Sequence, residues 1–425
     1  MSHDAHATMH PDALLRDIAS KLPVKPNARK RMIWMVCMAI GVISFGWLLM
    51  TTPQRAWGAY TINTLYFLGI AQAGVVLACA IRLGNGRWAG PVMRIAESLS
   101  AYLPFGIGFM VILLAVGVWN YLPWVHHVEP HQAPYLNIGF LWARTLIGLG
   151  LLYWLSRDLV RISLRTDAYL LKTHVPPELK GEYDKLSQGW RGDEAEEKWQ
   201  RDRLAMRAPQ IVLVYAGVFT VLSWDFVMSL TPEWVSTLFG WWFFMGAFLT
   251  GIAMTAFLST QFRAKYRLED YITRDHFWDI GKILFGFCVF WAYQYWSQYL
   301  PIWYGNLPEE TGWVFLRFEE PWRPYGFAAF GFIFAIPFVS LLNWYTKKNP
   351  FWLAFFSLMV LTGMWIERHV LVMPSLNPDT AWIGLPELGV TLGFLGVFGW
   401  AVQSFVTKYP VVKVADALRG EGRGH

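Results

Sequence analysis

Residues 223–240 read SWDFVMSLTPEWVSTLFG, and this stretch decides how the chain is interpreted. It begins inside an apolar run at 209–230, which is long enough to cross a bilayer as a helix of about 20 residues. The Asp225 carboxylate lies within that run. A charge inside the hydrocarbon layer is costly, so a functional role is the default interpretation of this residue.

The composition of the whole chain agrees with a membrane environment. Hydrophobic residues make up 55% of the 425 residues and charged residues 16%, whereas soluble domains carry roughly a quarter charged residues. Ten runs are long enough to span a bilayer, and none alternates with the period of a β-barrel strand. The sequence therefore predicts an all-α polytopic membrane protein with about ten transmembrane helices. The predicted spans are 32–50, 59–81, 99–121, 136–156, 209–230, 235–258, 276–299, 324–342, 351–372 and 384–406.

Lys and Arg residues lie almost entirely in one set of connections, and this bias sets the orientation. Both chain ends belong to that set, so both are predicted to be cytoplasmic. The basic excess thus follows membrane topology, and we predict no nucleic-acid binding. The exceptions are Arg55, Arg317 and Arg323 in the opposite connections, and Arg144, Lys282 and Arg368 within spans.

This orientation divides the chain into three parts. Residues 1–31 form a cytoplasmic N-terminal segment, 32–406 the ten-helix membrane domain, and 407–425 a cytoplasmic tail. Within the first part, one face of a short surface helix would be apolar. The large cytoplasmic connection at 157–208 is expected to be a solvated loop with short helices, the alternative being a docking surface for another subunit. The apolar face of the short helix in the N-terminal segment consists of Leu14, Leu15, Ile18 and Leu22.

Cysteine and histidine usage argues against a metal cofactor in this chain. Cys37, Cys79 and Cys288 stand alone in three different spans, and the sequence has no CxxC or CxxCH motif. A haem without covalent attachment would need facing axial ligands, yet His276 and His369 are predicted near opposite membrane faces. We therefore expect no metal to be bound by this subunit.

Polar residues within the spans form two layers. By helical rise, Asp225 and Glu367 each lie roughly 8 Å below the outer boundary, and Arg144 about 12 Å below it. Arg368 and His369 follow Glu367 directly. The sequence thus predicts an outer cluster of acids, bases and an imidazole.

The second layer lies toward the cytoplasm, in the run DHFWDIGK at 275–282. Asp275, Asp279 and Lys282 have i, i+4, i+7 spacing and so share one helix face, which His276 can join. The same span continues outward through Tyr293. For any single pair, a buried ion pair that only holds helices together is as good an interpretation as a functional one. Two layers on opposite sides favour proton transfer.

Three stretches resemble a known family. They are SWDFVMSLTPEWVSTLFG, HFWDIGKILFGFCVFWAYQYWSQYLPIWYGNLPEET and GMWIERHVLVMPS, which cover the fifth to seventh and the ninth predicted spans. They are similar to polysulfide reductase-type (NrfD-like) membrane subunits, in particular the ActF subunit of bacterial alternative complex III. The resemblance implies two four-helix bundles, spans two to five and six to nine, with spans one and ten at the periphery.

The resemblance also implies an activity and partners. The chain would be a subunit of a respiratory quinol:electron-acceptor oxidoreductase in the bacterial inner membrane, contributing a proton-transfer route and possibly a menaquinol pocket. It would assemble with lipids, a paralogous NrfD-like membrane subunit, an iron–sulfur or molybdopterin-like periplasmic subunit and multihaem cytochrome c subunits. Haem c and iron–sulfur clusters would reside in those partners. The implied quinone-binding candidates are Asp225, Arg144, His131 and Trp224.

Two other function classes fit the same sequence. A secondary transporter would also combine two helical bundles with buried charges. A structural anchor for extramembrane redox subunits would need the spans but not the buried charges. A transporter should purify without haem-bearing partners, and an anchor should keep every activity when Asp279 and Lys282 are neutralised together in an assembled complex.

Overall fold

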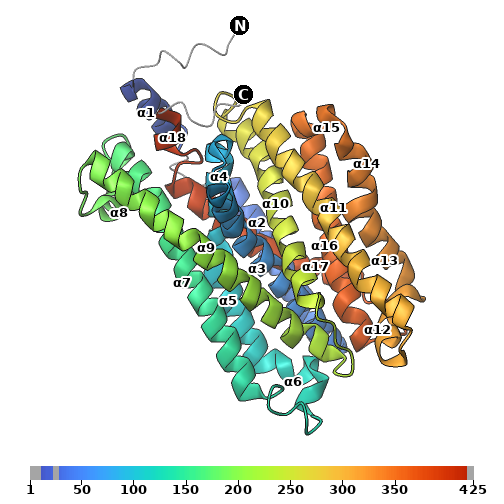
Figure 1. Ribbon diagram of the computed structural model, residues 1–425. Helices are drawn as coiled ribbons and strands as arrows, with labels where there is room; N and C mark the ends of the chain where they lie inside the picture. The colour runs from blue at the N-terminus through green and yellow to red at the C-terminus, as the bar shows by residue number, and fades with distance from the viewer. Residues whose placement is uncertain (1–10, 23–27, 419–425) are drawn as a thin grey trace.

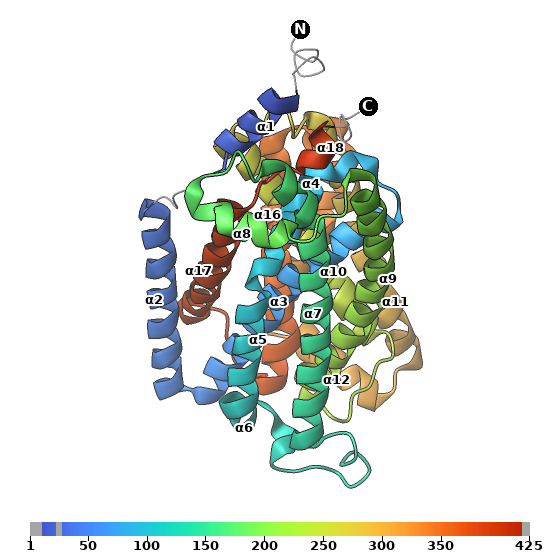
Figure 2. The same ribbon diagram turned by 90° about the vertical axis from the view of Figure 1, so that its left-hand side faces the viewer.

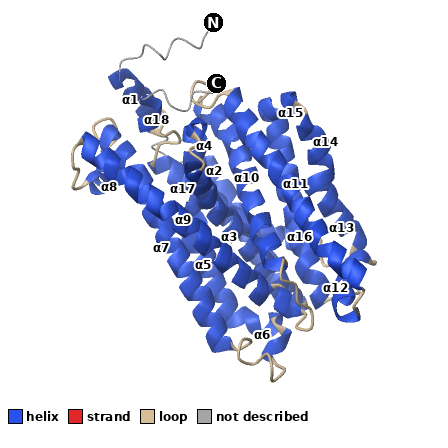
Figure 3. Ribbon diagram, viewed as in Figure 1, coloured by secondary structure: helices blue, strands red, loops and turns tan. Residues whose placement is uncertain are grey.

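The protein is built from helices. The computed structural model describes residues 11–22 and 28–418, and it has no strand in these ranges (Figure 3). Long apolar helices run side by side through the molecule (Figure 1). The prediction of an all-α polytopic membrane protein is therefore confirmed.

Nine helical segments within the described ranges are long and apolar enough to cross a membrane. Each coincides with one of the predicted spans, and several extend beyond it. They are Ala28–Thr51 (α2), Pro53–Leu83 (α3), Gly90–Tyr121 (α4 to α6), Ile138–Leu171 (α7), Asp193–Leu230 (α9 and one further turn), Phe239–Tyr266 (α10), Arg323–Leu342 (α13 and α14), Pro350–Leu376 (α16) and Leu385–Lys408 (α17). Within the composite segments, the helices are α4 (Gly90–Ser98), α5 (Leu103–Ile112), α6 (Val118–Tyr121), α9 (Asp193–Phe226), α13 (Arg323–Phe330) and α14 (Ile336–Leu342).

The remaining predicted span, 276–299, lies inside α11 (Arg274–Gly305). This helix begins with a capping box, in which the side chains of Thr273 and His276 each hydrogen-bond to the other residue's backbone N–H. It ends at Asn306, whose backbone is left-handed with φ +46°. Its glutamines, tyrosines and charged residues lower its mean hydropathy below that of the nine. It nevertheless packs along α10 and α14 within the bundle, in the place of a further crossing helix (Figure 1).

Two helices lie at the centre of the bundle. The most apolar stretch of α3 is 94% buried, whereas that of α2 is only 11% buried. α3 packs on α4, α5 and α9, while α10 packs on α11 and α16, so two groups of helices meet along α3 and α10. At that meeting a Cβ on Gly251 would lie 2.4 Å from the Ala73 Cβ, so only glycine permits this approach.

The peripheral helices α2 and α17 pack against each other at the edge of the molecule (Figure 2). Their backbones approach so closely that a Cβ on Gly41 would lie 2.3 Å from the Gly393 Cα. Small residues at such a crossing replace side-chain interdigitation by direct backbone contact. The pair is the peripheral arrangement expected for the first and last spans.

One end of the bundle, which we call the basic end, carries α1 (Pro11–Ser20), α8 (Pro177–Ser187), α15 (Trp344–Lys348) and α18 (Val414–Leu418) (Figure 1). The opposite end carries α6 and α12 (Pro308–Phe318). At the basic end the predicted apolar face of α1 is buried against α7, α8 and α18. Residues 1–10, 23–27 and 419–425 of the two predicted terminal segments lie outside the described ranges.

The connection at 157–208 differs from the expected loop. α7 and α9 are each 34 residues long, or about 51 Å at 1.5 Å per residue, and they continue well into this connection. Only α8 is a short helix. The continued part of α7 buries Leu164, Ala168 and Leu171, which a solvated loop would leave exposed.

Candidate functional site

Asp225 lies in the last turn of α9 and is fully buried. The Arg144 guanidinium on α7 donates to both of its oxygens, from Nη2 to Oδ1 at 2.6 Å and from Nε to Oδ2 at 2.7 Å. The Tyr135 hydroxyl donates to Oδ1 at 3.0 Å. Burial and the Asp225 carboxylate raise the pKa of Tyr135, which keeps that hydroxyl a donor. We call these three residues the Asp225 cluster, in which every carboxylate oxygen is occupied.

The other two quinone-binding candidates lie apart from this ion pair. His131 is exposed in the connection before α7, and Trp224 is half-buried on α9. The Trp224 indole nitrogen is buried without a hydrogen-bond partner among the described residues. None of the four candidates lines the large cavity described next.

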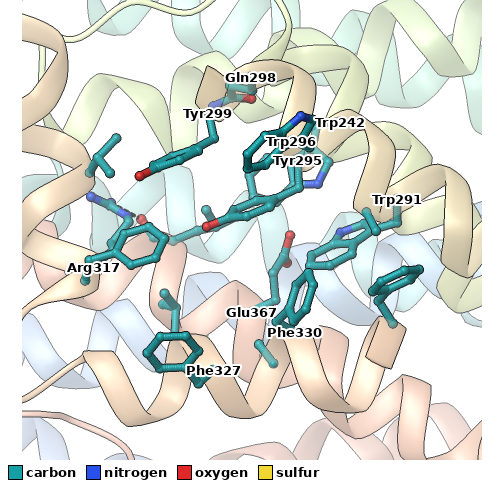
Figure 4. Close-up of a pocket in the computed structure, with 18 of the residues that line it drawn as sticks. Trp242, Trp291, Tyr295, Trp296, Gln298, Tyr299, Arg317, Phe327, Phe330 and Glu367 are labelled. Atoms are coloured by element: carbon teal, nitrogen blue, oxygen red, sulfur yellow. Dashed lines mark hydrogen bonds between the residues drawn. The ribbon is translucent and has the colours of Figure 1, made fainter. Parts of the chain in front are cut away.

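A cavity of about 630 Å³ lies within the second group of helices, between α10, α11, α12, α13 and α16. Its walls are mostly aromatic, and Glu367 projects into it from α16 beside Tyr295, Trp291 and Phe330 (Figure 4). We call it the Glu367 cavity. Its size falls in the range of small-molecule sites, roughly 300–1,000 Å³. The labelled lining residues are Trp242, Trp291, Tyr295, Trp296, Gln298, Tyr299, Arg317, Phe327, Phe330 and Glu367.

Buried polar atoms without hydrogen-bond partners concentrate at this cavity. Both Glu367 oxygens are buried, and neither has a partner of hydrogen-bond geometry within the described ranges. The same holds for Gln298 Oε1 and for the indole nitrogens of Trp242 and Trp291. Unpaired buried polar groups are costly, so a site that collects them is suited to a ligand or water that pairs them.

Arg317, on α12, supplies a cation at the same cavity. It donates to the carbonyl oxygens of Trp313 at 2.7 Å and Leu371 at 2.6 Å, and to Ser375 Oγ at 3.0 Å. Burial lowers its pKa well below the ordinary value. No carboxylate within the described ranges lies within 4.0 Å of it. Leu371, whose carbonyl accepts from Arg317, comes four residues after Glu367 on α16, and all three residues line the cavity.

The cavity opens sideways, between α11 and α13. Tyr293, Trp296 and Phe327 line it and are 63%, 53% and 62% exposed, so they form its mouth on the lateral surface. Next to the mouth, residues 331–335 form a π-helical turn between α13 and α14. Such turns break the regular α-helical hydrogen bonding and occur frequently at functional sites. A lateral mouth in a membrane-spanning bundle faces the lipid.

The predicted outer cluster is divided into two separate pairs. Arg368 Nη1 lies 3.3 Å from Glu367 Oε2, and its Nη2 donates to the Phe243 carbonyl at 3.0 Å. No hydrogen bond or ion pair between described residues joins this pair to Arg144 and Asp225. The predicted residues thus form two ion pairs with separate partners, because helical depth gives the height of a residue but not which neighbour its side chain meets.

His369 takes no part in either pair. Its Nδ1 lies 2.9 Å from the Trp365 carbonyl oxygen, and its ring packs on the Trp365 ring at 4.1 Å. The residue is fully buried. The predicted imidazole thus points away from the Glu367 cavity, whose lining includes Glu367 but not its two successors.

The charged residues predicted to share one face of α11 form two separate ion pairs. Lys282 Nζ lies 2.6 Å from Asp279 Oδ1, as i, i+3 spacing allows, whereas Asp275 pairs with Lys348 of α15 at 2.8 Å. The His276 ring turns back to Thr273 as part of the helix cap. Tyr293 lies further along α11, at the mouth of the Glu367 cavity.

Sequence reasoning missed a buried ion cluster at the basic end. Arg94 of α4 donates to Glu97 Oε2 and to Asp167 Oδ2, both at 2.6 Å, and Arg82 of α3 also pairs with Glu97. Arg94 and Glu97 are nearly fully buried. Their i, i+3 spacing was visible in the sequence, but the partner Asp167 comes from α7, far away along the chain. We call these four residues the Arg94 cluster.

Within residues 11–22 and 28–418, no group of three or more His, Cys, Asp and Glu side chains is arranged to hold a metal ion. All three cysteines are free thiols. A scan of the chain against protein-family models and a search of curated proteins found no match.

Proposed function

We propose that this chain is an integral membrane subunit of a respiratory quinol:electron-acceptor oxidoreductase, and that it binds menaquinol in the Glu367 cavity. One observation carries the proposal: a lipid-facing aromatic cavity holds the buried Glu367 carboxylate, which is ion-paired with its chain neighbour Arg368 at 3.3 Å and has no partner of hydrogen-bond geometry within the described ranges. The proposal includes a bacterial inner membrane with both chain ends in the cytoplasm. It also includes the partner subunits that the family resemblance implies.

The shape and chemistry of the cavity suit a quinol. A quinol has a flat ring, two hydroxyl groups and a long apolar tail. The aromatic walls formed by Tyr295, Trp291 and Phe330 suit the ring, and the mouth at Tyr293 and Phe327 would let the tail remain in the lipid. A ligand entering from the bilayer needs such a lateral opening.

The polar groups are also suitable for quinol oxidation. Oxidation of a quinol to a quinone releases two electrons and two protons, so a base must lie near the ring hydroxyls. Glu367 would accept the two protons in turn, passing the first to water before it takes the second, and Arg317 would donate a hydrogen bond to the ring oxygen farther from Glu367. The electrons would leave to iron–sulfur and haem c centres of the partner subunits.

Asp225 is a weaker quinol base than Glu367. Its oxygens already accept hydrogen bonds from Arg144 and Tyr135, whereas those of Glu367 have no partner of hydrogen-bond geometry in the described part of the chain. A ring placed at Asp225 would have to displace a bidentate arginine at 2.6 and 2.7 Å, whereas the contact of Arg368 with Glu367 is longer, at 3.3 Å. We therefore assign Asp225, with Asp279 and Lys282 at the other end of the bundle, to proton transfer rather than to quinol binding.

Photolabelling of the assembled complex with an azido-quinone tests the assignment. Labelled peptides should come from α11 and α16 of this chain, and Glu367→Gln should lower both labelling and quinol turnover. Asp225→Asn, which leaves the cavity lining intact, should keep the labelling. Labelling confined to a partner subunit, or full turnover with Glu367→Gln, would contradict the proposal.

The same preparation distinguishes the other function classes. A transporter should purify without haem-bearing partners. A structural anchor should retain quinol turnover when Glu367, Asp279 and Lys282 are neutralised together in an assembled complex. Loss of turnover in that variant supports the respiratory assignment.

A further inference from the structure

A second cavity, of about 410 Å³, lies at the basic end of the bundle. It is bounded by the start of α5, the middle of α7, α8 and the end of α17. Part of its lining is apolar, with contributions from Leu103, Val160 and Phe405. This cavity lies outside the Glu367 cavity, and no residue lines both.

Three cations line this second cavity: Arg157 and Arg161 on α7, and Lys185 on α8. The two arginines have i, i+4 spacing and so lie on one face of α7. All three are exposed, and within the described ranges none has a carboxylate within 4.0 Å. The cavity therefore carries positive charge that the described part of the chain does not neutralise.

The carboxylate that lines the same cavity is already engaged. Glu182 accepts a hydrogen bond from the Tyr409 hydroxyl, and its Oε2 lies 3.6 Å from Lys408 Nζ. It is thus held at the α17 side of the cavity, by groups other than the three cations. An anionic ligand would meet Arg157, Arg161 and Lys185 without displacing an existing ion pair.

The cavity also lies at the level where a bilayer meets water. Arg157 directly follows the predicted span 136–156, and Trp154, one turn earlier on α7, is 56% exposed. Tryptophan is enriched at the membrane–water interface, where Trp154 is placed by the end of the predicted span. Apolar surface for acyl chains thus continues from the basic cavity along the outside of α7.

We propose that this cavity binds the phosphate headgroup of an anionic glycerophospholipid of the phosphatidylglycerol class. Arg157 and Arg161 would donate to the phosphate oxygens, and Lys185 would add a third charge. The apolar lining at Leu103, Val160 and Phe405 would contact the glycerol and the first acyl carbons. Basic pockets between transmembrane helices on the cytoplasmic side are suited to such headgroups. Free inorganic phosphate shares the charge but would leave the apolar lining unused.

The test is a titration of the full chain, purified in a neutral detergent, with dioctanoyl phosphatidylglycerol. Dioctanoyl phosphatidylcholine and inorganic phosphate are titrated in parallel, and native mass spectrometry and thermal unfolding report binding. Phosphatidylglycerol alone should give a bound adduct and a higher unfolding temperature. Neutralising the three cations in Arg157→Gln/Arg161→Gln/Lys185→Gln should weaken its binding about 100-fold, since each basic residue near an anionic lipid surface contributes about fivefold.

A matched control removes three positive charges from the same end of the bundle without touching the cavity. Lys180→Gln/Lys198→Gln/Arg201→Gln changes exposed residues of α8 and α9 and should bind phosphatidylglycerol as the unchanged protein does. If the cavity triple variant fails to fold, the single variant Arg161→Gln, with an expected fivefold loss, replaces it. Equal weakening in both triple variants, or no weakening at Arg161→Gln, would overturn the proposal. Competition by inorganic phosphate at equal concentration would assign the cavity to free phosphate and overturn it as well.

Discussion

Arg144 holds the Asp225 carboxylate through two hydrogen bonds, of 2.6 and 2.7 Å, between helices α7 and α9. Both partners are largely or fully buried, with 10% of the arginine side chain and none of the aspartate side chain exposed. A bidentate pair of this kind fixes the two helices in register as well as in distance. Its loss would leave a buried charge without a counterion.

Arg144→Gln should therefore destabilise the protein by about 3–5 kcal/mol, the usual cost of breaking one side of a buried pair. Tyr135→Phe removes only one neutral donor from Asp225 and should cost about 1 kcal/mol. Thermal unfolding of the purified variants measures both. Equal effects of the two substitutions would contradict an ion pair as the main interaction in the Asp225 cluster.

The Arg94 cluster should be as sensitive as the Asp225 cluster. Arg94→Gln removes the cation that both Glu97 and Asp167 share, so we expect a loss of about 3–5 kcal/mol in unfolding free energy. Arg201→Gln is the comparison, because that arginine pairs with Glu197 on the helix surface and is 71% exposed. Such surface pairs contribute about 0.5 kcal/mol. A variant of Arg94 as stable as that of Arg201 would exclude a structural role for the cluster.

The crossing of α2 and α17 can be tested with two glycines of one helix. Gly41→Ala places a methyl group against the Gly393 backbone, which has no side chain to move away, and should cost about 1–3 kcal/mol. A Cβ on Gly46 meets nothing within 4 Å, and alanine there improves helix propensity by about 1 kcal/mol. Thermal unfolding and proteolysis of the chain next to α2 measure the stability of the two variants. Gly41→Ala should unfold at the lower temperature and be cleaved faster. The reverse order would contradict the close crossing.

Lys413 gives a pH dependence with a defined sign. Burial lowers its pKa to about 8, with Arg82 and Arg94 acting in the same direction and Glu97 and Asp416 against it. An unfolded lysine titrates near 10.4, so between about pH 8 and 10.4 the unfolded chain binds more protons than the folded chain. The unfolding free energy should therefore rise with pH across that window. Below the window, the contribution of Lys413 to it should be at its lowest.

Lys413→Met should remove this rise. Unfolding free energies of the unchanged protein and the variant, measured from pH 7 to 10.5, give the difference that belongs to Lys413. Other lysines titrate in both proteins and cancel in the comparison. Parallel curves over the whole range would show that Lys413 is charged in the folded protein throughout.

The fold was largely predictable because apolar runs and basic connections report on single helices. Helix pairing was less accessible, and the reason is visible at particular residues. Asp225, Arg144, Glu367 and Arg368 were predicted to lie together on the outer side, and buried ion pairs among them were one interpretation. Their separation into two sites depends on the rotation of α9 and α16, which hydropathy does not encode.

The most informative site residues lay in segments that looked unremarkable. Arg317 belongs to a connection between spans, and only the fold of α12 brings it to the cavity beside Glu367. Asp167 belongs to a connection expected to be solvated, yet it is buried against Arg94. In both cases a charged residue of a predicted connection is buried, Arg317 on α12 and Asp167 on the continuation of α7 beyond its predicted span.

The contact between α1 and α18 also determines how many times the chain must cross the bilayer. A chain that begins and ends on the same side of a bilayer must cross it an even number of times. The nine segments selected by apolarity alone would leave α1 and α18 separated by the thickness of the membrane. Their direct contact requires an even number of crossings, and α11, which packs along α10 and has buried glutamines, supplies the tenth.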